Sequence, residues 1–227
     1  MTTPEVALRD TWHQLAGRSH DLLLQGLLGR HREPHRHYHT ATHVMWVLRH
    51  VAELAPPAAS AAPFDLAAVQ LAALYHDAVY DPRSSDNEAH SATLAAGVAA
   101  ELGWAAPRCA LVHRLVLATA HLAGDAATHA AHDATGAVGG TGAAEVAVLL
   151  DADLAILGAA PNDYTAYASG VRAEYAHVPE PQWRAGRAAV LRALLAMQPL
   201  YRTPRMRSAR ESRARANLTA ELATLAG

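Results

Sequence analysis

The sequence predicts an all-α fold, a single helical domain of about eight or nine helices that spans residues 1–227. Hydrophobic residues make up 51% of the chain, which is enough for a sizeable core. Alanine is abundant and aromatic residues are scarce at 5%, and this balance favours helices over strands. Apolar residues also recur at helical spacing, whereas no segment alternates convincingly as a strand would.

The first helix is expected over residues 4–29, where Leu15, Leu22, Leu23 and Leu27 lie near helical spacing. A polar, His-rich turn follows it, and prolines end or separate the later helices. These helices are expected over residues 40–55, 64–79, 86–102, 107–122, 143–158, 161–176, 181–197 and 208–225. Residues 123–142, which are rich in glycine and alanine, are expected to form a long mobile loop.

Charge and cysteine content narrow the classes of partner. The formal net charge is −2, so nucleic acid is not an expected partner. All 19 basic residues are arginine. The single cysteine, Cys109, cannot form an internal disulfide, and the lack of disulfides is typical of proteins in a reducing compartment. The sequence has no apolar signal region and no uninterrupted apolar stretch of 18 residues. A cytoplasmic location without membrane partners is therefore expected, and the oligomeric state is left open.

Histidine is unusually frequent, with 15 residues, about three times the usual share. This excess indicates metal or acid–base chemistry. The adjacent His76 and Asp77 offer one nitrogen and one oxygen ligand, and further ligands would come from other helices. Such a mixed set suits Mn, Fe, Co, Ni or Zn, while carboxylates alone suit Mg. We therefore expect a divalent metal ion, of undetermined identity, in a core of roughly residues 36–158, with the C-terminal helices at 159–227.

Two aspartates late in the chain, Asp151 and Asp153, are candidates for a further ligand of this site. On a helix, Asp153 shares an apolar face with Leu149, Leu150 and Leu157, so its carboxylate should be buried and should need a cation. A buried salt bridge to an arginine is the alternative. Asp151 has smaller neighbours and is expected to lie less deeply.

The turn before the second helix supplies further candidates. His39 and His43 are four residues apart and share one helical face, so they could be a ligand and an acid, or two ligands. A His-rich surface turn is the alternative, because His31, His35 and His37 are close by. These three are predicted to be surface residues.

Other polar residues have both a structural and a functional interpretation. Glu88 follows Ser85 at capping-box spacing and could instead, or also, lie near the metal water. His121 could bind a second metal ion or a phosphate, with His113 as the weaker candidate and simple packing as the alternative for both.

Two segments are expected to be less informative. Residues 129–133 (HAAHD) imitate the His-Asp pair but lie in the Gly/Ala loop, so we expect them to be dispensable. A basic tract is expected to be a solvated helix face, with some arginines able to reach a substrate phosphate. It comprises Arg202, Arg205, Arg207, Arg210, Arg213 and Arg215.

The chain carries the pattern H…HD…D, in this order, on successive predicted helices. This pattern resembles that of the HD superfamily of metal-dependent phosphohydrolases. More narrowly, the chain resembles a bacterial family of predicted HD phosphohydrolases with DNE, DADL-ILG and YRTP segments, here residues 86–88, 151–158 and 201–204. The resemblance covers roughly residues 30–220. It implies a helical fold and a metal ion bound by His43, His76, Asp77 and a late aspartate.

Residues 38–44 (YHTATHV) are also similar to the YHNxxHAxDV pattern of cyclic-nucleotide phosphodiesterases. By that resemblance His43 is a ligand and His39 the general acid. The ADLS of those enzymes matches residues 152–155 and selects Asp153 as the fourth ligand. The chain lacks their size and their glutamine-bearing pocket, so a cyclic-nucleotide substrate is not implied.

The expected function is hydrolysis of a small phosphorylated molecule, a nucleotide or related phosphomonoester, by metal-activated hydroxide. His39, Asp77 and Glu88 are the expected catalytic residues. Asp77 could bridge a second metal ion, but the four-residue set ensures only one. The alternatives left open are a phosphodiesterase of the same superfamily, a non-catalytic metal or nucleotide sensor, and a structural zinc protein.

Overall fold

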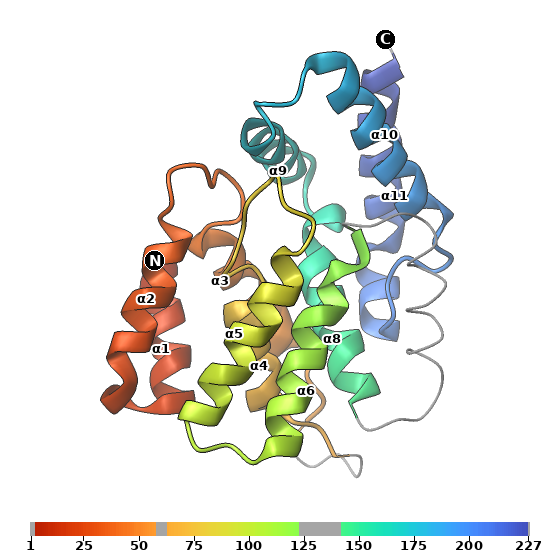
Figure 1. Cartoon of the computed structure of the whole chain (residues 1–227). Helices are drawn as coiled ribbons and strands as arrows, with labels where there is room; N and C mark the ends of the chain where they lie inside the picture. The colour runs from red at the N-terminus through yellow and green to blue at the C-terminus, as the bar shows by residue number, and fades with distance from the viewer. Residues whose placement is uncertain (1–2, 58–62, 123–141, 227) are drawn as a thin grey trace.

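The computed structural model describes residues 3–57, 63–122 and 142–226. This part of the chain is built from helices joined by turns and contains no strand, so the all-α prediction is confirmed (Figure 1). None of its helices combines the length and apolar character needed to cross a bilayer.

The helices of the first half of the chain form one group, and α9, α10 and α11 lie to one side of it (Figure 1). The first half comprises α1 (Pro4–Ala16), η1 (Arg18–His20), α2 (Asp21–His31), α3 (Ala41–Leu54), α4 (Leu66–Tyr75), α5 (Asn87–Glu101), α6 (Ala106–Leu117) and η2 (Ala118–Leu122). The second half comprises α8 (Ala143–Asp153), η3 (Leu154–Gly158), α9 (Pro161–Glu174), α10 (Glu180–Ala196) and α11 (Pro204–Ala226). Helices α5 and α6 pack side by side, as do α10 and α11.

The single first helix predicted over residues 4–29 is wrong, because Gly17 divides it into α1, η1 and α2. Gly17 has a φ of 69°, in the left-handed region that glycine tolerates best, and its N–H bonds to the carbonyl of His13. Two later boundaries also shift. Helix α8 tightens into a 3₁₀ turn at Leu154, and α11 begins at Pro204 rather than at residue 208.

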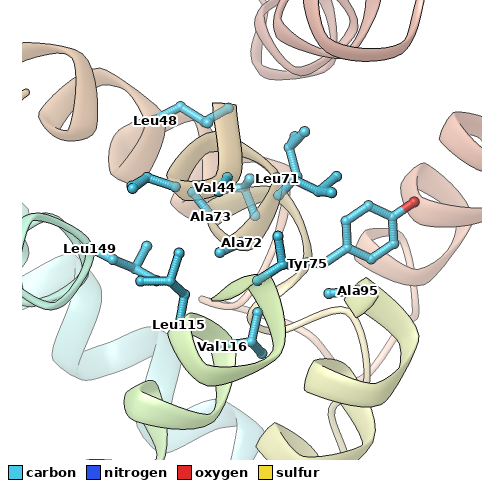
Figure 2. Packing of buried hydrophobic residues seen from close by; sticks show 14 of the residues in the cluster. Val44, Leu48, Leu71, Ala72, Ala73, Tyr75, Ala95, Leu115, Val116 and Leu149 are labelled. Atoms are coloured by element: carbon cyan, nitrogen blue, oxygen red, sulfur yellow. The ribbon is translucent and has the colours of Figure 1, made fainter. Parts of the chain in front are cut away.

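The larger core cluster lies among α1 to α6 and α8 (Figure 2). Val44, Tyr75 and Ala152 belong to it and are at most 2% exposed. Each is the chain neighbour of one of the predicted metal ligands. Close packing of these three residues therefore fixes the backbone from which the ligands project.

The second core cluster joins η3 to α9, α10 and α11. Gly158 ends η3 where a Cβ atom would lie 2.6 Å from Cβ of Arg210 and 2.9 Å from its carbonyl oxygen. Only glycine allows this approach of η3 to α11. The glycine of the DADL-ILG segment thus has a packing role.

Asp151 connects the two core clusters. Its carboxylate accepts the backbone N–H groups of Arg202 and Thr203, each at 2.7 Å, and the Thr203 hydroxyl at 2.6 Å. The expectation that Asp151 lies less deeply than Asp153 is wrong: Asp151 is 0% exposed, whereas the Asp153 side chain is 17% exposed. These three donors replace the water that a buried carboxylate loses.

The arginine tract is only partly a solvated face. Arg210 donates to the carbonyl of Gly158, and Arg215 donates to the carbonyls of Leu195 and Met197. Arg210 therefore holds the end of η3 against α11, and Arg215 holds the end of α10 against α11, while Arg205 and Arg207 are exposed.

Candidate metal centre

Four side chains from three helical segments meet at one point. Nε2 of His43 lies 3.3 Å from Oδ2 of Asp77 and 3.3 Å from Oδ1 of Asp153. Nε2 of His76 lies 2.9 Å from Oδ2 of Asp77 and 3.5 Å from Oδ1 of Asp153. The two Nε2 atoms are 3.0 Å apart. The structure thus brings together all four residues that the sequence analysis selected as ligands.

Helix ends position these side chains. His43 lies in the first turn of α3, whose N-cap residue Thr40 accepts the N–H of Thr42. His76 is the C-cap residue of α4, and Asp153 is the last residue of α8. The ends of α3, α4 and α8 therefore point their polar residues to one place while the helix bodies stay in the core.

A hydrogen bond fixes the tautomer of His76. Its Nδ1 lies 2.9 Å from the carbonyl oxygen of Ala73, which can only accept, so Nδ1 carries a proton. In the neutral ring Nε2 then presents its lone pair to the cluster. Metal-binding histidines usually donate their other ring N–H to such a carbonyl, which fixes the orientation of the ring.

The donor atoms fit a divalent metal ion. The ligand atoms of His43, His76 and Asp77 all lie within 4.8 Å of one another, so these three residues could hold one ion. Neighbouring ligands about 2.0–2.2 Å from an ion are themselves about 3 Å apart, as the separations here are. Two nitrogens with carboxylate oxygens suit Zn and the other first-row divalent ions.

The electrostatics of the cluster favour a bound cation. Burial alone would lower the pKa of His76, but the Asp77 and Asp153 carboxylates raise it well above its ordinary value. Burial likewise would raise the pKa of Asp153, but His43 and His76 bring it below its ordinary value. Among the described residues, the ion-pair partners of Asp153 are these two histidines and no arginine. The arginine salt bridge considered as an alternative for Asp153 is therefore absent from this part of the chain.

His39 lies beside the cluster and is held by a glutamate. Its Nδ1 is 2.7 Å from Oε2 of Glu174, whose other oxygen accepts the backbone N–H groups of residues 37, 38 and 39. The Tyr80 hydroxyl donates to Oε2 of Glu174 as well, at 2.8 Å. Burial would raise the pKa of Glu174, but His39 and these N–H groups lower it to about 2. Glu174 is thus an ionised, buried carboxylate that orients the His39 ring.

Arg36 holds the backbone on the other side of the cluster. Its buried guanidinium donates to the carbonyls of Asp77 and Ala78 at 2.7 and 3.1 Å and to the carbonyl of His39 at 3.1 Å. Glu33 accepts from its Nε at 2.9 Å. One side chain therefore ties the His39 segment to the segment that carries Asp77.

A cavity of about 490 Å³ opens beside the four side chains, and His39, Asp77 and Asp153 line it. Glu88 lines it too, and burial together with the nearby Asp77 raises the pKa of Glu88. The predicted capping box is wrong, because Asp86 and not Ser85 is the N-cap residue of α5, and the Asp86 side chain makes no capping hydrogen bond. Glu88 therefore closes no capping box with Ser85, and it lines the cavity.

The structure describes the side chains of four of the other candidate histidines, His31, His35, His37 and His113. The prediction that His31 is a surface residue is wrong, because it is 3% exposed at the end of α2, while His35 and His37 are exposed as expected. His113 is half-buried on α6 and does not line the cavity. The side chain of His121 and the whole HAAHD segment lie outside the described residues.

Comparison of the chain with protein-family models, with curated proteins and with solved structures gives no match.

Two residues of the site were not selected from the sequence, Glu174 and Arg36. Glu174 carried a readable signal, because it continues the helical spacing of Tyr164, Tyr167 and Val171 on α9. A carboxylate in such a stripe should be buried and partnered, which is the reasoning that selected Asp153. Arg36 carried no comparable signal, since its partners are backbone carbonyls that only the fold brings together.

Proposed function

We propose that this chain is a metal-dependent phosphohydrolase of the HD type that cleaves small phosphomonoesters. One observation carries the proposal: two imidazole nitrogens and two carboxylates converge beside a cavity, with His39 at its edge. The donor set suits a divalent ion with positions left for substrate or water. The order of these residues along the chain also matches the pattern by which the sequence resembles HD phosphohydrolases.

Each residue has a distinct part in this proposal. His43, His76, Asp77 and Asp153 hold the ion, which when bound supplies Lewis acidity and lowers the pKa of a water molecule. Nδ1 of His39 is hydrogen-bonded to Glu174. The other ring nitrogen, Nε2, is therefore the atom that gives a proton to the leaving-group oxygen. Glu88, whose pKa is raised, faces the same cavity and can accept a proton from the attacking water.

Metal removal and replacement test the proposal. The purified protein is treated with a chelator, dialysed and reloaded with Mn, Fe, Co, Ni, Zn or Mg, and phosphate release is measured on phosphomonoesters and phosphodiesters. We expect turnover of monoesters only after reloading. Full activity in the metal-free protein contradicts the mechanism, and turnover of diesters alone makes the protein a phosphodiesterase. Tight metal binding without any turnover favours a sensor.

A matched pair of variants removes one histidine each. His76→Ala should lose metal and activity together. His113→Ala should keep both, because His113 lies on α6 outside the cavity. Equal loss in the two variants would contradict the assignment of the site.

A further inference from the structure

The cavity is larger than a phosphate group needs. It begins at the candidate metal centre and extends between the start of α5, η3, α9 and α10. Its volume of about 490 Å³ lies in the range of sites that enclose a small organic molecule. Much of the far wall is aliphatic, with Ile156, Leu157, Val171 and Val190 among its residues. The space beyond the metal centre is therefore suited to an organic group and not only to solvent.

Aromatic rings lead from His39 into this space. The Tyr80 ring lies 4.3 Å from the His39 ring, between centroids, and at an interplanar angle of 32°. Tyr175 interacts with Tyr80, and its ring lies 5.6 Å from that of Trp183. All four rings line the cavity. Their faces and edges offer stacking surface for a planar group of a ligand.

The lining offers little positive charge. Arg187 is its single arginine within the described ranges, and Glu221 already binds that guanidinium at 2.7 and 3.0 Å. The chain has no lysine, and all 19 arginines lie in the ranges that the structure describes. Asp77, Asp153 and Glu88 add negative charge to the same cavity. A chain of phosphates needs several cationic donors, and this lining supplies none that is unengaged.

We propose that the substrate is a phosphomonoester with a single phosphate attached to a bulky, ring-bearing group that lies along Tyr80, Tyr175 and Trp183. The inference rests on the proposed function, because the phosphate is taken to lie at the metal centre. It places nucleoside monophosphates and aryl-alkyl phosphates inside the substrate class. Nucleoside triphosphates and small polar esters such as glycerol phosphate lie outside it.

Gly186 allows the cavity to be changed without disturbing the core. It lies on α10, lines the cavity and is exposed, and an added Cβ atom would meet nothing within 4 Å. Gly186→Leu therefore narrows the space for the ring. Gly97 is the matched control, because it is also an exposed helical glycine with nothing within 4 Å of an added Cβ, and it lies on α5 outside the lining.

The first experiment measures binding by calorimetry with Mn²⁺ present. The probes are 3-phenylpropylphosphonate and methylphosphonate, which share a phosphonate and cannot be hydrolysed. We expect the phenylpropyl compound to bind at least about tenfold more tightly, as burial of a phenyl ring predicts. Gly186→Leu should reduce this ratio severalfold, and Gly97→Leu should leave it unchanged. Equal affinity for the two probes, or the same change in both variants, overturns the inference.

The second experiment compares kcat/KM within two series. We expect AMP to exceed ATP, and 3-phenylpropyl phosphate to exceed glycerol phosphate, each by about tenfold or more. The last two are both esters of primary alcohols, so their leaving groups are similar. Phosphate release with the opposite preferences overturns the inference but leaves the proposed function standing. Tight binding of the ring-bearing phosphonate without turnover of any ester overturns the proposed function but leaves the inferred ligand class standing.

Discussion

Nδ1 of His39 lies 2.7 Å from Oε2 of Glu174, a residue 135 positions later in the chain. The same glutamate accepts three successive backbone N–H groups that end at His39. The ring and the main chain of His39 are therefore both fixed by one buried carboxylate on α9. This arrangement leaves Nε2 of His39 available at the edge of the cavity.

The role of His39 can be separated from metal binding. His39→Ala should keep its metal and lose about a hundredfold to ten-thousandfold in turnover of alkyl phosphates, because an alkoxide leaving group needs a proton. The loss should be smaller for aryl phosphates, whose leaving groups need little protonation. Metal content and kcat on both substrate types are the measurements. The exposed His37 serves as control, and His37→Ala should keep its activity. Loss of metal in His39→Ala would show that the ring is a ligand or a structural support.

Glu174 predicts a specific dependence of stability on pH. Its pKa is about 2 in the folded protein against an ordinary value of 4.5, so the ionised form is stabilised by folding. This contribution, about 3 kcal/mol, is present above pH 4.5 and is lost as the pH falls towards 2. Unfolding free energies of the wild type and Glu174→Gln should therefore converge between pH 5 and pH 2. A constant difference across that range would refute the account.

The two aspartates of the DADL segment should respond differently to the same change. Asp153→Asn should lose bound metal, because the amide removes a charge from the cluster. Asp151→Asn should keep metal but melt at lower temperature, because its carboxylate holds Arg202 and Thr203. Metal analysis and thermal melting of both variants show which aspartate binds the metal and which one stabilises the fold. The reverse pattern of metal loss would show that the assignment of the ligand is wrong.

Metal binding should release protons. The pKa of His76 is raised well above its ordinary value by Asp77 and Asp153 despite burial, so the metal-free site is protonated near neutral pH. A divalent ion must displace that proton, and its affinity should rise with pH by up to about tenfold per unit. Calorimetry in two buffers of different ionisation enthalpy measures the proton release. Identical heats in both buffers would contradict this prediction.

Gly158 should tolerate no side chain. In Gly158→Ala the new Cβ atom meets Arg210 at 2.6 Å, so η3 and α11 must move apart. We expect a loss of about 1–3 kcal/mol in unfolding free energy. Gly97→Ala has open space and should be neutral or stabilising by up to about 1 kcal/mol. Urea unfolding of the two variants gives the comparison, and similar values would contradict the packing argument.

The helical class was predictable because it depends on short-range apolar spacing, and the four clustered residues were predictable from the His76-Asp77 pair together with the resemblance to HD phosphohydrolases. Helical spacing and the His76-Asp77 pair are visible within a few residues of each other. The break at Gly17 was missed because leucine spacing continues through it, and a left-handed φ leaves no mark in the apolar pattern. The depths of Asp151 and Asp153 were reversed for a different reason. Burial of Asp151 depends on donors at residues 202 and 203, which are distant in sequence.

Residues that support the site were the hardest to predict. Glu174 binds the backbone of a segment more than a hundred residues away, and only its place in an apolar stripe could have indicated a buried partner. The shape of the cavity was equally hidden, because its walls come from η3, α9 and α10 as well as from the start of α5. Such relations arise from tertiary packing, which periodicity within one helix does not encode.

The carbonyl contacts of Arg36 have a consequence for the choice between ions. Because one buried guanidinium joins the backbone at His39, Asp77 and Ala78, it restricts movement of the backbone that carries Asp77 and so limits the width of the candidate site. An ion whose preferred bond lengths match that width can enter without rearrangement. Ca²⁺, which prefers longer bonds of about 2.3–2.6 Å and more ligands, would have to spread this braced backbone. Any discrimination by ionic radius would therefore depend on the scaffold around the proposed ligands, and the Arg36 side chain that braces this scaffold is not one of the four.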